Sequence, residues 1–490
     1  MGDRTLFVPP HVGDNVLPNI HLFHKLLRYS RRSPAPVAVR DLNAGIERTY
    51  QHMLSDVLAV RNALRKNLST RARQSLDEDK EVYIGLMAPG GYEYTVGFIA
   101  ILATGAAVVP MDMNGASMVI FTSGTTGPPK GAVQRRTYLT GAAEAVADQY
   151  NITDKDTVLH VLPVHHASGV GLTFLPFIMA GACIEFRSGG FDAAWTWERW
   201  KRGGLAFFSG VPAIYMRMMR YYEENISNQP REVRRLYDAG AKNIRVMLCG
   251  TSALPTPVSE FWRQIRNGPI MTRYGATEFG AVIRTSLDDQ HTPVNSVGTL
   301  SEAVSLKVDE EGQILVKCPH MFSKYVFDEK ATKDAHDADG YFKTGDIARR
   351  EGKYYFILGR ASIDIIKSGG YKISALDIER EIMGLDYISE VMVVGVDDEE
   401  FGQRVAAAIS LKRDQKSAGK ALTLTELRED LRSKLSGYKM PTILRVVDGE
   451  LPKSVTGKVQ KKVLGPLFFP QNYRDLREVQ VWRKTRRNRL

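Results

Sequence analysis

The stretch from residue 118 to 131, MVIFTSGTTGPPKG, constrains this chain more than any other part of its sequence. An apolar run leads into a turn rich in glycine and hydroxyl side chains, which ends at a lysine. Glycines let backbone N–H groups approach a phosphate, while the hydroxyls and the lysine add donors and positive charge. A surface hairpin would not need hydroxyls interleaved with glycines. The pattern therefore predicts a phosphate-binding loop whose candidate ligands are Thr122, Ser123, Gly124, Thr125, Thr126, Gly127 and Lys130.

This loop differs from a Walker A motif. A Walker A loop places Gly-Lys-Ser/Thr at the start of a helix, whereas here Pro128 and Pro129 precede Lys130 and Gly131 follows it. The P-loop NTPase fold is therefore not expected.

Strand and helix patterns alternate on both sides of the loop. Residues 50–68 have the spacing of an amphipathic helix, and a strand at 82–87, a helix at 94–102 and a strand at 106–111 follow. This order indicates a parallel α/β sheet. Further strands are expected at 118–121, 158–162, 183–186, 206–209 and 245–249.

The pattern changes in the last third of the chain. Strands at 313–317 and 354–358, beside glycine turns, are expected to be antiparallel and to form a β-barrel-like part. From residue 361 the chain reads as a compact α/β unit, with strands at 391–396 and 406–411 and a helix at 424–435. Because 490 residues exceed what one core supports, we predict a large N-terminal α/β region, 1–360, and a small C-terminal α/β domain, 361–490.

Composition excludes several classes of protein. The net charge of +11 raises the question of a polyanionic partner, but no zinc finger, RNP signature or basic heptad helix accompanies it. Nucleic acid is therefore not expected, and anionic small molecules explain a basic cleft equally well. Cys183, Cys249 and Cys318 are too few and too scattered for a disulfide framework or a zinc site. No apolar run is long enough to span a bilayer.

The location of the protein is only weakly indicated. The first residues, MGDRTLFVPPHVGDN, lack the pattern of a secretory signal, and the last three, NRL, resemble a peroxisomal address only loosely. We expect a cytoplasmic protein, with peroxisomal and mitochondrial locations as alternatives. Nothing in the sequence indicates the oligomeric state.

The segment TSGTTGPPKG resembles the phosphate loop of the adenylate-forming superfamily, which contains acyl-CoA synthetases, firefly luciferase and nonribosomal adenylation domains. Three further segments follow in the order of that family, so the resemblance extends over nearly the whole chain. It implies an ATP-dependent acid–CoA ligase, which forms an acyl-adenylate with Mg²⁺ and passes the acyl group to coenzyme A. The implied partners are a small carboxylic acid, ATP and CoA.

The segment 273–278, RYGATE, resembles the family's YGxTE motif. The resemblance implies that Tyr274 stacks on adenine and that Thr277 binds the α-phosphate. Glu278 would hold Mg²⁺, which spreads negative charge as pyrophosphate leaves. Thr277 and Glu278 are thus expected to be catalytic.

Two further turns are implied to bind the nucleotide. Gly250, Thr251 and Ser252 follow the strand at 245–249 and, in the family, lie beside adenine and the acyl group. In the TGD motif, Asp346 would accept hydrogen bonds from the ribose hydroxyls. Arg360 would lie near ribose or phosphate.

The small domain carries two motifs of the family. In SGGYK, Gly369 and Gly370 belong to the loop that this domain inserts for thioester formation, after a rotation about a hinge that follows Arg360. In PKSVTGK, Lys458 would bridge the carboxylate and the α-phosphate and stabilise charge growing at phosphorus. Nearby Lys461 and Lys462 are expected to be solvated.

The identity of the acid is indicated by a closer resemblance to the malonyl-CoA synthetase group. The segments LHVLPVHHASG, VPAIYMRMM and GRASIDIIKSGGYKISALDIE carry it. His166 would be the catalytic gate between the acyl and ATP pockets, and Arg273 would pair with the distal carboxylate of a short diacid. Those synthetases have a histidine where Ser168 stands, so another small acid remains open beside malonate and methylmalonate.

A second departure lies just before the phosphate loop. Members of the family have several dozen residues between the strand that ends near Asp112 and the loop that starts near Met118, and here the two nearly touch. A strand–helix unit is therefore expected to be missing. Two alternatives to the CoA ligase remain: an enzyme that loads a carrier protein, and an inactive nucleotide-binding remnant.

Overall fold

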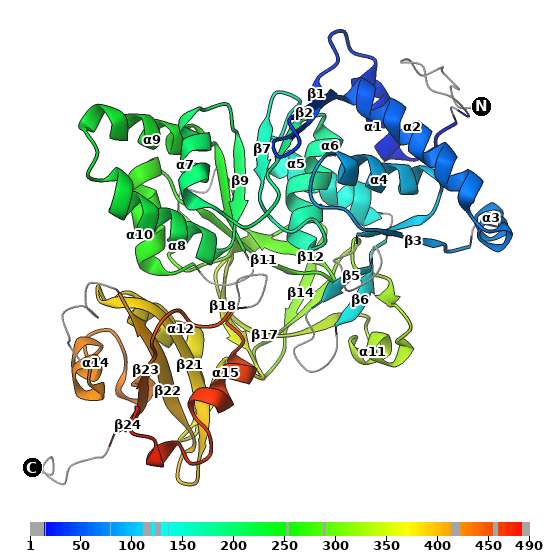
Figure 1. The fold of residues 1–490 in the computed structure, drawn as a ribbon. Coiled ribbons are helices and arrows are strands. Elements are labelled where there is room, and N and C mark those ends of the chain that lie inside the picture. Colours follow the sequence, from blue (N-terminus) through cyan, green and yellow to red (C-terminus); the bar gives the residue numbers. More distant parts are fainter. Residues whose placement is uncertain are drawn as a thin grey trace, which may run out of the picture.

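The computed structural model describes residues 14, 16–78, 80–110, 119–122, 129–135, 137–250, 254–287, 291–412, 422–453 and 459–482. Among these residues the largest sheet has 13 strands, in the order β14-β15-β17-β18-β13-β12-β11-β10-β9-β7-β8-β1-β2. Figure 1 shows this sheet in the upper part of the molecule, with a separate α/β unit below it, drawn in yellow to red.

One half of the large sheet is mostly parallel, as the sequence predicted. Its strands are β1 (Val37–Asp41), β2 (Ile46–Thr49), β7 (Thr157–His160), β8 (Cys183–Phe186), β9 (Phe207–Gly210), β10 (Val246–Cys249) and β11 (Met271–Ala276). All residues of β7, β8, β9 and β10 are buried, which is typical of parallel strands covered on both faces. Only β1 and β2 pair antiparallel within this half.

Helices cover both faces of this half (Figure 1). Alternate strand residues enter two different cores, since Val158 packs in one cluster and Leu159 in the other. The first core contains α1 (His21–Ser30), α2 (Tyr50–Asn67), α4 (Tyr92–Ala103), α5 (Ala143–Gln149) and α6 (Leu175–Ala180). The second contains α7 (Ala193–Lys201), α8 (Pro212–Tyr221) and α10 (Thr256–Arg266), with α9 (Arg231–Asn243) packed against α7 and α10.

The other half of the sheet is antiparallel, as predicted. Its described strand pairs end at β14, and none of them closes the sheet, so the barrel-like part stays a prediction. The strands of this half are β12 (Gly280–Arg284), β13 (Gly298–Leu300), β14 (Ser305–Val308), β15 (Gln313–Lys317), β17 (Phe342–Glu351) and β18 (Tyr354–Arg360). A three-stranded sheet contains the two strands on either side of the phosphate loop; it consists of β5 (Val119–Thr122), β6 (Lys130–Val133) and β16 (Lys324–Tyr325), with α11 (Glu329–Asp334) beside it.

The strand–helix–strand unit predicted before the phosphate loop is confirmed. The strands β3 (Tyr83–Leu86) and β4 (Ala107–Pro110) flank α4 and pair in parallel, with α3 (Thr70–Asp77) preceding them. Within the described residues, these two strands form a sheet of their own. The shortened connection at 112–118 lies outside the described residues.

The C-terminal unit has its own sheet and cores. It contains β19 (Ile365–Ser368), β20 (Tyr371–Ser374), α12 (Ala375–Met383), β21 (Ile388–Asp398), β22 (Gly402–Leu411), α14 (Leu424–Asp430), β23 (Ile443–Val446), α15 (Lys461–Phe468) and β24 (Val479–Val481). The helix predicted at 424–435 ends at Asp430, because the next residues make tighter turns, such as the hydrogen bond from the Lys434 N–H to the Leu431 carbonyl. The domain boundary at 360/361 stays a prediction. No helix among the described residues is both long and apolar enough to cross a lipid bilayer.

A direct contact joins the two parts of the chain. Arg220, on α8, donates hydrogen bonds of 2.9 Å to the carbonyl and the hydroxyl of Ser389, on β21. The C-terminal unit is thereby held against the helices of the second core.

A buried histidine predicts how stability depends on pH. His160, at the end of β7, is 2% exposed, and burial lowers its pKa to about 4. Below about pH 6.5 His160 is protonated in the unfolded chain but stays neutral in the folded chain. The free energy of unfolding therefore falls between neutral pH and pH 4, by up to about 3 kcal/mol. In His160→Gln, urea unfolding at pH 7 and pH 4.5 should show a smaller acid loss. An equal loss in both proteins would contradict this role.

Candidate active site

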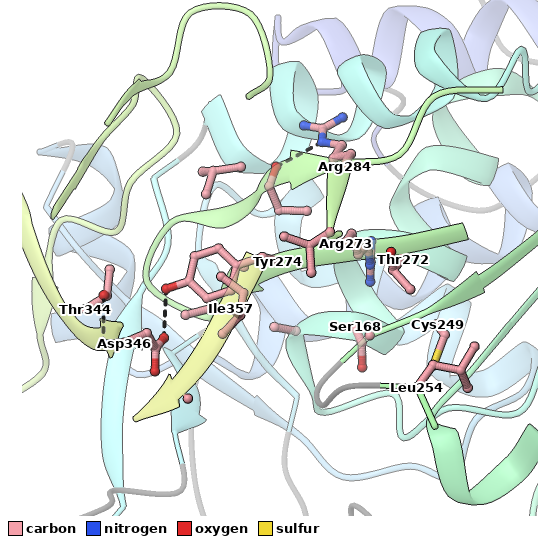
Figure 2. A pocket seen from close by; sticks show the side chains of 18 of the residues that line it. Ser168, Cys249, Leu254, Thr272, Arg273, Tyr274, Arg284, Thr344, Asp346 and Ile357 are labelled. Atoms are coloured by element: carbon pink, nitrogen blue, oxygen red, sulfur yellow. Dashed lines mark hydrogen bonds between the residues drawn. The ribbon is translucent and has the colours of Figure 1, made fainter. Parts of the chain in front are cut away.

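A large cavity lies at the carboxyl ends of the parallel strands, where open α/β sheets bind ligands. Its volume is about 2240 Å³, and its walls come from both the large sheet and the C-terminal unit. Single-ligand pockets are smaller, about 300–1,000 Å³, so this cavity has room for more than one substrate. Figure 2 shows Ser168 and Arg273 toward one end of it and Thr344 and Asp346 toward the other.

Asp346 organises one end of the cavity. Its Oδ2 accepts a 2.7 Å hydrogen bond from the Tyr274 hydroxyl (Figure 2), and its Oδ1 lies 2.8 Å from Nε of Arg360. Asp346 and Arg360 are register partners on β17 and β18. Burial, together with the Asp346 carboxylate, raises the pKa of the Tyr274 phenol well above its usual value. The structure thus brings together three residues that the sequence assigned to nucleotide binding.

Glu278 and Lys130 meet through a tyrosine that sequence reasoning missed. Glu278 is 8% exposed and accepts a 2.7 Å hydrogen bond from the hydroxyl of Tyr325. Nζ of Lys130 lies 5.2 Å from the centre of the Tyr325 ring. Burial and the Glu278 carboxylate raise the pKa of Tyr325, so it stays a neutral donor. Tyr325 lies on β16 outside every motif. The pairing of β16 with β6 and the hydrogen bond from the Phe322 N–H to the Glu278 carbonyl bring it here.

The turn after β11 is fixed by a further contact. The carbonyl of Thr277 accepts a 2.7 Å hydrogen bond from the side chain of Gln134, which follows β6. Thr122, at the end of β5, pairs with Lys130, and both residues line the cavity. The phosphate-loop strands and the turn with Thr277 and Glu278 therefore border the same space.

Several predicted site residues lie outside the described residues, although their neighbours line the cavity. Three described neighbours line the cavity: Gly250 precedes Thr251 and Ser252, Lys130 follows the phosphate loop, and Val459 follows Lys458. The predicted residues concerned are Ser123, Gly124, Thr125, Thr126, Gly127, Thr251, Ser252 and Lys458.

Arg273 lies at the opposite end of the cavity, next to Gly250. Its guanidinium forms no ion pair and no hydrogen bond with the residues that the structure describes. Burial lowers the pKa of Arg273, and no carboxylate of the described chain compensates it. A desolvated charge without a partner is costly, so this arginine is suited to an anionic ligand.

His166 and Ser168 form the wall beside Arg273. Nδ1 of His166 lies 2.8 Å from the hydroxyl of Ser168, just before the π-helix Gly169–Phe174. A side chain at Gly169 would clash with the Pro163 carbonyl, only 2.0 Å from the position of a Cβ, so glycine is required for this close approach. Such π-helical turns are frequent at functional sites.

The glycine pair predicted to act in thioester formation lies elsewhere. Gly369 and Gly370 connect β19 to β20 with φ angles of +55° and +83°, a backbone region that favours glycine. Neither belongs to the described residues that line the cavity. In this arrangement the loop is therefore not part of the site.

Lys461 corrects a prediction from the sequence, which expected a solvated side chain. The side chain is only 11% exposed, and Nζ lies 2.7 Å from Oδ1 of Asp364 and 2.8 Å from Oε1 of Glu379. Burial lowers its pKa, but the two carboxylates outweigh this effect and raise it. Asp364 also accepts the backbone N–H of Arg360 at 3.0 Å. The prediction was wrong because both carboxylates are distant in sequence.

Lys461→Met should destabilise the C-terminal unit, because it leaves two carboxylates without a cation. Breaking a buried ion pair in this way costs about 3–5 kcal/mol. Urea unfolding followed by circular dichroism measures the loss, with Lys462→Met, at the neighbouring exposed lysine, as the matched control. Equal unfolding free energies in the two variants would contradict this role of Lys461.

Comparison with known proteins agrees with this geometry. The family model of AMP-binding enzymes matches residues 111–326, and that of the AMP-binding enzyme C-terminal domain matches 377–458. The mitochondrial malonate–CoA ligase ACSF3 of Xenopus laevis is 35% identical over 72% of this chain and 66% of its own length, about two thirds. Its Homo sapiens counterpart is 32% identical over 79% of this chain and 74% of its own length. The acyl-CoA ligase oryP of Aspergillus oryzae is 29% identical over 93% of this chain and 94% of its own length.

Solved structures share the fold. ATP-bound MatB from Rhodopseudomonas palustris has a TM-score of 0.77 at 22% identity and covers 92% of this chain and 99% of its own. A malonyl-CoA ligase complex with methylmalonyl-CoA and AMP has a TM-score of 0.58 at 25% identity and covers 88% of this chain and 100% of its own. The two family models match residues of both the large sheet and the C-terminal unit. The chain therefore belongs to the family of AMP-binding, adenylate-forming enzymes.

Proposed function

We propose that this chain is an ATP-dependent acid–CoA ligase that acts on a small dicarboxylic acid such as malonate or methylmalonate. The observation that carries the proposal is Arg273, whose guanidinium has no counter-ion among the described residues and lies in the same cavity as the Tyr274, Asp346 and Arg360 cluster. The names of the relatives, malonate–CoA ligases and an acyl-CoA ligase, support the same reaction.

ATP would lie between two polar clusters of the cavity, one of Tyr274, Asp346 and Arg360 and the other of Lys130, Glu278 and Tyr325. Asp346 would accept the ribose hydroxyls, with Tyr274 beside the base and Arg360 near ribose or phosphate. Lys130 and the phosphate loop would hold the phosphates. The described residues contain no cluster of three or more histidine, cysteine, aspartate or glutamate side chains suited to a metal. Mg²⁺ is often bound by one or two carboxylates plus substrate phosphates; Glu278 would supply the carboxylate, and the ion would neutralise phosphate charge.

The acid would lie with one carboxylate toward the α-phosphate and the other against Arg273. A fixed, bidentate partner for the distal carboxylate leaves only one carboxylate free to react, which orients the substrate. His166, held by Ser168, would form the boundary between the acid and the nucleotide.

The reaction would proceed in two halves. The carboxylate attacks the α-phosphorus, pyrophosphate leaves, and Lys458 balances the negative charge at phosphorus. The resulting mixed anhydride is then attacked by the thiolate of CoA, which displaces AMP. Because Gly369 and Gly370 do not line the cavity here, the second half requires residues 361–490 to rotate relative to residues 1–360.

ATP–pyrophosphate exchange across a panel of acids tests the proposal. Malonate or methylmalonate should support exchange at least tenfold faster than propionate or benzoate, since one lost charge contact is worth about 1.5–3 kcal/mol. Adding CoA should then yield the thioester and AMP. Absence of exchange with every acid would reject the ligase and favour the inactive remnant, and acyl transfer only to a carrier protein would favour the carrier-loading enzyme.

The location is a separate proposal. The vertebrate relatives carry "mitochondrial" in their names, which favours the mitochondrial alternative over the cytoplasmic location expected from the sequence. Cell fractionation followed by immunoblotting distinguishes the two.

A further inference from the structure

A second arginine lies behind Arg273. Arg284, on β12, is the direct register partner of Arg273, on β11, so the two side chains lie on the same face of the sheet, and both line the cavity (Figure 2). Like charges at such positions are destabilising, and the pair is partly buried. Burial lowers the pKa of both groups, and Arg284 lowers that of Arg273 further. Neither forms an ion pair with a carboxylate of the described residues.

Within the described part of the chain, neutral groups alone hold Arg284 in place. Its Nε donates to the Ala281 carbonyl at 3.0 Å, and its Nη1 donates to the Ala145 carbonyl at 3.5 Å and to the side-chain oxygen of Gln149. These acceptors anchor the guanidinium between β12 and α5 without neutralising it. Arg284 is therefore a fixed positive charge and not a mobile surface group.

Three polar groups near the two arginines are neutral. Tyr138 is 5% exposed and lines the cavity, and burial raises its pKa to about 12, although Arg273 opposes the shift. The hydroxyl of Tyr150 is buried and has no hydrogen-bond partner in the described residues. Burial raises its pKa, although both arginines oppose the shift. His320 lines the cavity, its Nδ1 is equally unpartnered, and burial and Arg284 lower its pKa. This end of the cavity thus holds two positive charges and polar groups that are uncharged at neutral pH.

We infer that Arg284 is a specificity-determining residue, whose fixed charge makes the acyl end of the cavity selective for acids with a second negative charge. Arg273 contacts the distal carboxylate, and Arg284 adds to its field from the neighbouring strand, where the low dielectric of a partly buried site strengthens the attraction. The identity of the acid in this inference rests on the proposed function. The preference for a second negative charge rests on the two arginines alone.

The closing experiment compares three substitutions at this position by malonate and propionate kinetics in pyrophosphate exchange. Arg284→Met should lower the ratio of kcat/KM for malonate to that for propionate about tenfold, mainly through the KM for malonate, because one of two attracting charges is lost. Arg284→Gln removes the charge but keeps a donor for the carbonyls, and should lower the ratio equally. Arg284→Lys keeps the charge and should preserve most of the ratio.

A matched control separates charge from structure. Arg266 is likewise held by backbone carbonyls, those of Pro269 and Ile244, and does not line the cavity. Arg266→Met should reduce thermal stability and leave the ratio unchanged. The inference is overturned if the uncharged variants at position 284 keep the wild-type ratio, or if they change it no more than Arg284→Lys does.

Malonate binding without ATP distinguishes this inference from the proposed function. Malonate should raise the thermal unfolding midpoint of the wild-type chain more than that of Arg284→Gln, whether or not exchange occurs. Binding that depends on Arg284, without exchange in the wild type, would reject the ligase and keep the inference. Exchange with equal malonate stabilisation of both chains would keep the ligase and reject the inference.

Discussion

Lys458→Ala is expected to slow acyl-adenylate formation by about 10²–10³, since removing one group that stabilises transition-state charge costs that much in other enzymes. Lys458 itself lies outside the described residues. Lys453 and Val459, which form an antiparallel β-bridge, both line the cavity. Pyrophosphate exchange measures the adenylation step directly. Thioester formation from a supplied acyl-adenylate should change far less.

Lys412→Ala is the matched control for this prediction. Lys412 is an exposed lysine of the same unit, beside the end of β22, and its replacement should leave exchange unchanged. An exchange rate in Lys458→Ala equal to that of the control would remove Lys458 from the reaction.

Arg273→Met should reduce kcat/KM for malonate by about 10²–10³. Loss of one partner from a desolvated charge pair costs about 2–5 kcal/mol, because the other charge stays buried without compensation. A monocarboxylic acid has no distal charge to lose a contact, so its kcat/KM should fall by less than tenfold.

Arg273→Lys provides the control for charge against geometry. A lysine keeps the charge but not the planar fork, so it should recover part of the malonate activity. If Arg273→Met affected malonate and propionate equally, the arginine would be structural and the acid would have to be recognised elsewhere.

The regular elements were predictable from local patterns. The strand 183–186 coincides with β8, and the helix 50–68 with α2, because buried parallel strands are continuously apolar and an amphipathic helix repeats its apolar positions. The motifs likewise indicated the nucleotide cluster, since Tyr274, Asp346 and Arg360 each stand in a recognisable segment.

The contacts between motifs could not be predicted, because they depend on pairing between distant strands. Tyr325 reaches Glu278 because β16 pairs with β6 and the preceding Phe322 N–H binds the Glu278 carbonyl. Lys461 meets Asp364 and Glu379 only after the C-terminal unit has folded. Arg284 has the same origin: its significance comes from the register of β11 and β12, in which it lies opposite Arg273.

The shortened connection expected before the phosphate loop stays a prediction, because residues 111–118 lie outside the described residues. Parallel sheets are normally large and covered on both faces, yet β3 and β4 form a two-stranded parallel sheet within the described residues. The alignment with oryP extends over 525 positions and is longer than this chain of 490 residues, so part of that relative has no counterpart here. The described cavity residues Lys130, Glu278, Asp346 and Arg360 are nonetheless brought together.

Transfer of oxygen from the acid to AMP tests the central claim most directly. If the carboxylate attacks the α-phosphorus, malonate labelled with ¹⁸O in its carboxylates should yield malonyl-CoA and AMP that carries one ¹⁸O per turnover, as read by mass spectrometry. Unlabelled AMP, or ADP in place of AMP, would contradict an acyl-adenylate.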